Sequence, residues 1–238
     1  MHEKGAKSFY RIEDGKRQFW NQLTSEYADI PGQDGLVNLQ VAKSNGILWQ
    51  NSGTTISDLG DGILNVEFHT KMNTIGGEVL AGLNKAIDMA EAEYEGLVVC
   101  NEGGNFSAGA NVGMIFMMAA EQEMDELDFA VRQFQQTMMR MRYSSIPVVA
   151  APHNLTLGGG CELCLHSDKV VAHAELYMGL VEFGVGVIPG GGGTKEFAMR
   201  LADELRDGDI RSNQFRHRLM TIAQAKVATS AHEAFELG

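Results

Sequence analysis

The chain of 238 residues carries 31 acidic and 19 basic side chains, and its net charge of −12 argues against non-specific binding to nucleic acid. Hydrophobic residues make up 44% of it, which is ordinary for a globular protein, and no apolar run approaches the roughly eighteen residues that span a bilayer. The segment 1–16 contains no apolar signal core. We therefore expect a cytoplasmic protein with no membrane span and no nucleic-acid partner.

Residues 1–56 are predicted to form an arm or interdomain linker. Segments 8–12 and 17–20 have the composition of two short strands, and Asp14 and Gly15 between them favour a β-hairpin turn. The rest of the segment is rich in polar turn signals and lacks the apolar content for a core of its own.

The main domain is expected to span residues 57–238 and to alternate strands with helices. Short apolar runs predict buried strands at 62–68, 97–100, 148–151 and 169–172. Apolar residues at helical spacing predict helices at 77–92, 111–120, 124–143, 159–166, 194–205 and 215–227. Ser230, with Glu233 three residues later, resembles a capping box that opens a last helix. The fold class is α/β.

An active site is predicted within residues 155–194, where two glycine-rich turns each lie beside a carboxylate. The first turn precedes Glu162, and the second follows Glu182. If Gly159 begins a short helix, its N–H is free and Glu162 lies one turn further along the same side. A second N–H from the segment 106–111 would complete an oxyanion hole, and the carboxylates could transfer protons.

Each of these features alone also has a purely structural interpretation. Glycine-rich strand–helix turns serve packing in many α/β proteins, and a single glutamate is more often a solvated surface acid. Two nucleotide-binding motifs do not fit, because Thr194 precedes Lys195 and Pro189 replaces the last glycine of a dinucleotide fingerprint. Cys161 and Cys164 form a C-x-x-C, but their helical spacing favours packed, reduced thiols over a redox pair or zinc site. No metal is expected.

Three motifs together resemble the crotonase (enoyl-CoA hydratase/isomerase) superfamily: FSAGAN at 106–111, LTLGGGCEL at 155–163 and GLVEFGVGVIPGGGGT at 179–194. The likeness extends from about Gly60 to the end of the chain. It is greatest to the hydratase region of bacterial multifunctional proteins in which a 3-hydroxyacyl-CoA dehydrogenase precedes the hydratase. The resemblance implies a spiral of ββα units, a trimer-type homo-oligomer, and C-terminal helices in relatives beyond the point where this chain stops.

The resemblance also implies roles for single residues. Glu162 and Glu182 match the two catalytic glutamates, and the N–H groups of Ala110 and Gly159 match the oxyanion hole. The resemblance further suggests substrate-binding positions at Ala108, Gly109, Gly158 and Met114. Lys71 is a candidate for the phosphates of coenzyme A, although a solvated surface lysine is the simpler interpretation. Coenzyme A would be part of the substrate, with no tightly bound cofactor.

The presence of both glutamates favours hydration of an enoyl-CoA thioester in fatty-acid β-oxidation. Two alternatives stay open: a double-bond isomerase on the same fold, and a non-catalytic acyl-CoA-binding or assembly module of a larger protein. Met114, Met117 and Met118 follow the FSAGAN motif and could accommodate long acyl tails, although ordinary packing explains methionine there equally well.

Overall fold

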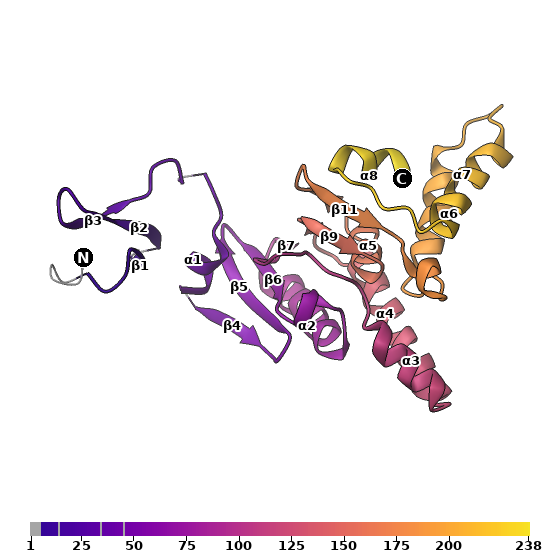
Figure 1. Cartoon of the computed structure of the whole chain (residues 1–238), viewed down its shortest axis with the longest axis horizontal. Coiled ribbons are helices and arrows are strands. Elements are labelled where there is room, and N and C mark those ends of the chain that lie inside the picture. The colour runs from indigo at the N-terminus through magenta and orange to yellow at the C-terminus, as the bar shows by residue number, and fades with distance from the viewer. Residues whose placement is uncertain (1–5, 14, 34, 45) are drawn as a thin grey trace.

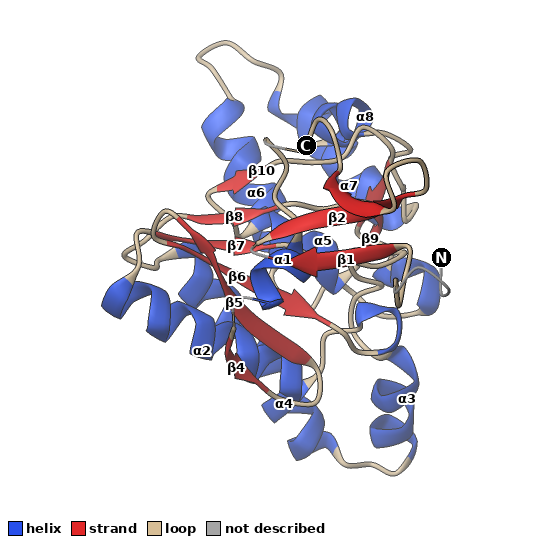
Figure 2. Ribbon diagram, turned by 90° about the vertical axis from the view of Figure 1, so that its left-hand side faces the viewer, coloured by secondary structure: helices blue, strands red, loops and turns tan. Residues whose placement is uncertain are grey.

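A computed structural model of the chain describes residues 6–13, 15–33, 35–44 and 46–238. At its centre is a six-stranded sheet in the order β10-β8-β7-β6-β5-β4 (Figures 1 and 2). Its strands are β4 (Ile47–Gln50), β5 (Thr54–Gly60), β6 (Ile63–Phe68), β7 (Gly96–Val99), β8 (Val148–Ala150) and β10 (Lys169–Val170). The first three pair antiparallel, and β6, β7, β8 and β10 pair parallel. The four predicted strands are confirmed, each within two residues at either end.

The sheet also contains β4 and β5, which the sequence patterns did not predict. The run 51–55 is polar, and for that reason the main domain was expected to begin after residue 56. In the structure Thr54 and Thr55 are buried within β5. The Thr54 hydroxyl donates to the carbonyl of Glu78, and the Thr55 hydroxyl lies 3.1 Å from His69 Nε2. Hydroxyls that find partners can be buried at little cost, so β5 can be a strand inside the sheet. The edge strand next to it is β4, which begins at Ile47, before the expected boundary.

Helices cover both faces of the sheet. Helix α2 (Gly77–Glu93) contacts β5, β6 and β7 through its apolar stripe, and α4 (Met124–Arg142) packs on α2. The short α1 (Leu39–Ser44) contacts β5 from the other side (Figure 1). The core stripe of α2 consists of Val79, Leu80, Leu83, Ala86, Ile87 and Ala90, which recur at the helical spacing read from the sequence.

Three helices close the C-terminal side: α6 (Gly193–Glu204), α7 (Arg211–Ala223) and α8 (Ala231–Leu237). The prediction at 215–227 placed α7 four residues late, because α7 ends before Ala225, which has a left-handed φ of 48°. Ser230 caps α8 by accepting from the Glu233 N–H, whereas the Glu233 carboxylate bonds Thr229 instead of returning to Ser230. Among the described residues, every helix is too short or too polar to cross a bilayer.

The N-terminal arm forms a three-stranded antiparallel sheet of β1 (Tyr10–Glu13), β2 (Lys16–Asn21) and β3 (Glu26–Asp29), which stands away from the main sheet in Figure 1. The predicted hairpin is the β1–β2 pair, although Asp14 in its turn lies outside the described residues. Trp20 is buried and stacks edge-on against Tyr27, with ring centroids 5.1 Å apart. The arm therefore has a small aromatic cluster, where the sequence predicted no core.

The contact between α2 and β5 leads to a stability prediction. A Cβ at Gly82 would lie 2.4 Å from Thr54 Cγ2, whereas a Cβ at Gly77 meets open space. We expect Gly82→Ala to lower the free energy of unfolding by about 1–3 kcal/mol, despite the higher helix propensity of alanine. Gly77→Ala on the same helix should be neutral or stabilising by up to about 1 kcal/mol. Urea denaturation measures both, and equal stability of the two variants would contradict the close packing.

Candidate active site

Three segments that are distant in sequence meet beside a second, two-stranded parallel sheet. Its strands are β9 (Asn154–Leu157) and β11 (Leu176–Gly179), and β9 leads into α5 (Gly159–Leu165). The FSAGAN loop runs along β9, because the Ser107 N–H donates to Leu155 O at 3.0 Å and Ser107 O accepts from the Leu157 N–H at 2.9 Å. The sequence predicted these motifs as one site, and the backbone places them side by side.

The N–H groups of Ala110 and Gly159 lie next to each other. Gly109 has a φ of +85°, and a Cβ on it would lie 2.8 Å from the Gly159 nitrogen. A Cβ on Gly159 would lie 3.4 Å from the Ala110 nitrogen. Neither N–H donates a hydrogen bond to another described residue, and both residues line the same cavity. The predicted donors are therefore adjacent and available to an acceptor in that cavity.

That cavity has a volume of about 860 Å³ and a mostly apolar wall. The predicted site residues on its wall are Ala108, Ala110, Met114, Gly158, Gly159, Glu162 and Glu182. Gly109 is buried and does not line the cavity, so the structure does not place it in contact with a substrate. Lys71 is an exposed residue of the short 3-10 turn at Lys71–Asn73 and does not line the cavity. Its contact with phosphates stays a prediction.

Glu162 lies in α5 with only 3% of its surface exposed. Burial raises the pKa of its carboxyl, and the backbone N–H groups at the start of α6 counteract that rise. The Gly193 N–H donates to Glu162 Oε1 at 2.8 Å. Only glycine fits at position 191, because a Cβ there would lie 2.5 Å from both Glu162 Oε2 and the ring of Phe134. The second glycine run thus binds Glu162, a role that the sequence analysis did not assign to it.

Glu182 begins the 3-10 turn at Glu182–Val185 and has the opposite environment. Both of its carboxylate oxygens are buried, and neither has a hydrogen-bond partner among the described residues. Burial, together with the negative charge of Glu162, raises the pKa of Glu182 to about 7. The two predicted glutamates therefore face one cavity with different affinities for a proton.

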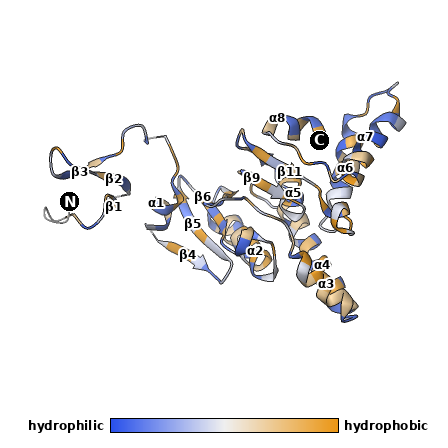
Figure 3. Ribbon diagram, viewed as in Figure 1, coloured by the Kyte–Doolittle hydropathy of each residue, from blue (hydrophilic) through white to orange (hydrophobic). Residues whose placement is uncertain are grey.

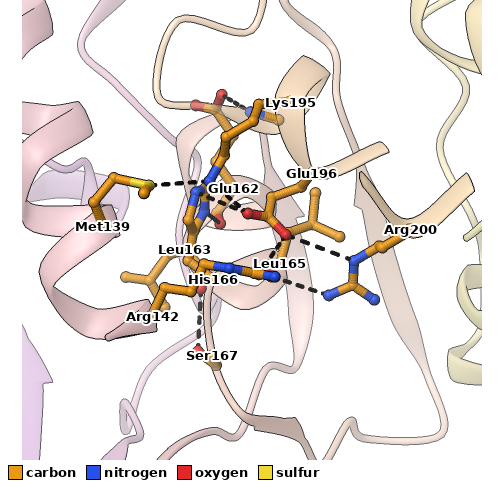
Figure 4. Close-up of polar contacts among 11 residues, drawn as sticks. Met139, Arg142, Glu162, Leu163, Leu165, His166, Ser167, Lys195, Glu196 and Arg200 are labelled. Carbon is orange, nitrogen blue, oxygen red and sulfur yellow. Dashed lines mark hydrogen bonds and ion pairs between the residues drawn. The ribbon is translucent and has the colours of Figure 1, made fainter. Parts of the chain in front are cut away.

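A buried charged cluster behind Glu162 was missed by the sequence analysis (Figure 4). Its centre is Glu196 of α6, which is completely buried. The Glu196 carboxylate lies 2.6 Å from Arg142 Nη1, 2.7 Å from Lys195 Nζ and 3.4 Å from His166 Nε2. The one signal in the sequence is an acidic residue in the first turn of a helix, and the helix dipole alone explains such a residue.

The C-x-x-C cysteines are packing residues, as the spacing predicted. Cys161 and Cys164 are buried and unpaired, and burial raises the pKa of both thiols. Within the described part of the chain, no group of three or more His, Cys, Asp and Glu side chains is placed to hold a metal ion.

The raised pKa of Glu182 predicts a pH-dependent stability. In the unfolded chain this carboxyl loses its proton near pH 4.5, whereas the folded chain keeps the proton up to about pH 7. The folded state binds more protons across that window, so the free energy of unfolding falls as the pH rises through it. Glu182→Gln should therefore be more stable than the parent by about 3 kcal/mol at pH 8 and equally stable at pH 4. Urea denaturation at both pH values measures this, and a pH-independent difference would refute it.

Comparison with known proteins agrees with the site. The family model described as enoyl-CoA hydratase/isomerase matches residues 58–205. A Bacillus subtilis protein described as a probable 3-hydroxyacyl-CoA dehydrogenase is 43% identical over 238 residues, which cover all of this chain and 30% of that protein. A fatty acid oxidation complex subunit alpha from Psychrobacter cryohalolentis is 32% identical over 158 residues, covering 62% of this chain and 21% of that protein. The chain thus spans less than a third of these curated relatives.

Solved structures share the fold. An enoyl-CoA hydratase from Bacillus anthracis superposes with a TM-score of 0.63 at 26% identity, covering 79% of this chain and 68% of that one. An enoyl-CoA hydratase from Thermoplasma volcanium gives a TM-score of 0.65 at 24% identity, covering 79% and 70%. The predicted crotonase fold is confirmed. With its three motifs gathered around one cavity, this chain belongs to the enoyl-CoA hydratase/isomerase family of enzymes.

Proposed function

We propose that the chain is an enoyl-CoA hydratase, which adds water across the trans-2 double bond of an enoyl-CoA thioester to give a 3-hydroxyacyl-CoA. One observation carries the proposal: two buried carboxylates of different acidity face the same cavity as two free N–H groups. The relative described as part of a fatty acid oxidation complex supports a place in β-oxidation.

The two N–H groups activate the thioester. The carbonyl oxygen of the substrate accepts hydrogen bonds from Ala110 and Gly159, which draws electron density away from the β-carbon. As water attacks, the π electrons move toward the carbonyl and negative charge develops on its oxygen. Preorganised donors stabilise that charge more in the transition state than in the ground state, by about 3–4 kcal/mol for each donor.

The glutamates divide the proton transfers. Glu162, whose anion is stabilised by the Gly193 N–H, accepts a proton from water while the water oxygen bonds to the β-carbon. Glu182 is protonated below about pH 7 and donates its proton to the α-carbon as the enolate collapses. The product gains one hydroxyl and one hydrogen, so the elements of water are added. Each transfer contributes a factor of about 10² to 10⁴.

Changing either glutamate to glutamine tests the assignment. Glu162→Gln and Glu182→Gln should each lower kcat for crotonyl-CoA by at least about 10²-fold, with little change in the Kd for a CoA thioester. The parent kcat/KM should fall above about pH 7 as Glu182 loses its proton. Glu175→Gln, which alters an exposed glutamate outside the cavity, serves as the control. Near-normal turnover in either site variant would contradict the proposal.

An isomerase is the second candidate, because an isomerase moves one proton between carbon atoms and Glu182 alone, with a pKa of about 7, could do so. The pairing of Glu182 with Glu162 favours hydration, which needs both an acid and a base. Product analysis separates the two: a hydratase converts a 2-enoyl thioester to a 3-hydroxyacyl thioester, whereas an isomerase converts a 3-enoyl to a 2-enoyl thioester. Binding of both without turnover would indicate an assembly module.

The acyl tail is proposed to lie between α3 (Val112–Ala120) and α4. Figure 3 shows α3 coloured hydrophobic along most of its length. The apolar residues of the cavity wall there include Met114, Ile115, Met118, Leu127, Ala130 and Val131, and Glu126 also lines it. Flexible methionines adapt to tails of different length, which supports long-chain substrates.

A chain-length series with a blocked cavity tests this placement. Ala130→Phe adds bulk to the cavity wall, so kcat/KM should fall about tenfold for long enoyl-CoA substrates and little for crotonyl-CoA. Ala120→Phe places the same ring on an exposed position of α3 that does not line the cavity, and should leave the series unchanged. A parent enzyme that turns over only the shortest substrate would refute the acyl cavity.

The name of the Bacillus subtilis relative supports a larger setting. We propose that this chain is the hydratase part of a multifunctional protein with a fused 3-hydroxyacyl-CoA dehydrogenase. In that protein it would act in the cytoplasm as a trimer-type homo-oligomer, with coenzyme A entering only as part of the substrate.

A further inference from the structure

Glu162 is held at two points by two different groups. Its side chain accepts from the Gly193 N–H at the start of α6. Its main-chain carbonyl lies 2.7 Å from Nδ1 of His166, one turn further along α5. Since a carbonyl can only accept, Nδ1 carries the proton of the imidazole, and His166 Nε2 faces away from Glu162.

Glu196 shares a helix turn with the first of these groups and lies beside the second. It lies three residues after Gly193 in α6, so it moves with the first turn of that helix. Its Oε1 atom lies 3.4 Å from His166 Nε2, and its Oε2 atom lies 2.6 Å from Arg142 of α4. Figure 4 shows these side chains converging behind Glu162. Because Nε2 of this imidazole carries no proton, it makes no hydrogen bond to Glu196, and the buried carboxylate joins α4 to α6 through Arg142.

Stability alone is a weak reason for such a cluster. A buried carboxylate loses its hydration, and replacing a buried ion pair by apolar residues is often neutral or stabilising. Glu196 is fully buried and is surrounded by Arg142, Lys195 and, at 4.0 Å, Arg200. A directed ion pair between two helices, here Arg142 of α4 with Glu196 of α6, does however fix how those helices sit relative to one another.

We propose that Glu196 is a positioning residue for Glu162: its ion pair with Arg142 ties α6 to α4, and so holds the Gly193 N–H against the Glu162 carboxylate. The consequence for catalysis rests on the proposed hydration, in which Glu162 is the base. Without this ion pair the Gly193 amide moves away and the Glu162 anion loses a hydrogen bond. The pKa of Glu162 then rises further above its ordinary range.

Other groups that titrate or carry charge near Glu162 must be accounted for. They are Glu182 from the 3-10 turn, Cys161 and His166 from α5, Lys195, Glu196 and Arg200 from α6, and Arg142 from α4. Burial lowers the pKa of His166 and raises that of Cys161, so neither changes charge near pH 7. Glu182 does titrate near pH 7, so the Glu162 titration is carried out in the Glu182→Gln variant, which lacks that carboxyl.

The test is a ¹³C NMR titration of the Glu162 carboxyl in the full chain. We expect Glu196→Gln to raise the midpoint of the Glu162 titration by about one pH unit. Glu204→Gln makes the same chemical change on the exposed end of the same helix, where Glu204 pairs with Arg218, and should leave the midpoint unchanged. With Glu182 intact, Glu196→Gln should lower kcat about tenfold at pH 7, leave KM unchanged and move the acidic limb of kcat/KM upward.

A second variant keeps the test decisive if Glu196→Gln does not fold. Arg142→Gln leaves Glu196 paired with Lys195 and should raise the Glu162 midpoint by a smaller amount. An unchanged Glu162 titration in folded Glu196→Gln, or in Arg142→Gln where the first variant is unfolded, would overturn the positioning role. Because the titration needs no turnover, an inactive parent would contradict the hydratase proposal and leave this one standing.

Discussion

The hydrogen bond from the Gly193 N–H to the Glu162 carboxylate is the contact on which the rest of the site depends. A carboxylate with 3% of its surface exposed loses most of its hydration, and backbone N–H groups at the start of α6 offset that loss. Gly191, just before α6, leaves room for the ring of Phe134 of α4. A shift of α4 relative to α6 would therefore also change the orientation of Glu162.

Glu182 differs from Glu162 in environment and not in chemistry. Its oxygens are buried without hydrogen bonds from described residues, and the neighbouring anion disfavours a second negative charge. Backbone N–H groups stabilise the anion of Glu162, whereas Glu182, with a pKa of about 7, has no such partners, so the proposed base and the proposed acid differ in their environments. The unfavourable energy of this arrangement is concentrated at Glu182, where function and stability oppose each other.

The sequence predicted the parts of the fold that depend on local periodicity. Helices such as α2 and buried strands such as β7 follow from apolar spacing alone. The glycine-rich motifs predicted Gly159 and both glutamates as site residues, and the family resemblance that these motifs carry implied Ala110. It did not predict β5, whose polar threonines are buried because α2 and His69 supply partners. Glu196 was missed for the same reason, since its role arises from contact with Arg142, which lies 54 residues away.

Helix α4 connects the two halves of the site. It carries Ala130 and Phe134 on the wall of the cavity and Arg142 on the cluster behind Glu162. A rigid helix cannot move outward at one end to widen the cavity without disturbing the packing or the ion pair at the other. The same helix consequently fixes the cavity proposed for the acyl tail and the orientation of Glu162, the proposed base. The glycines that meet Phe134 leave no room for a side chain between them and its ring.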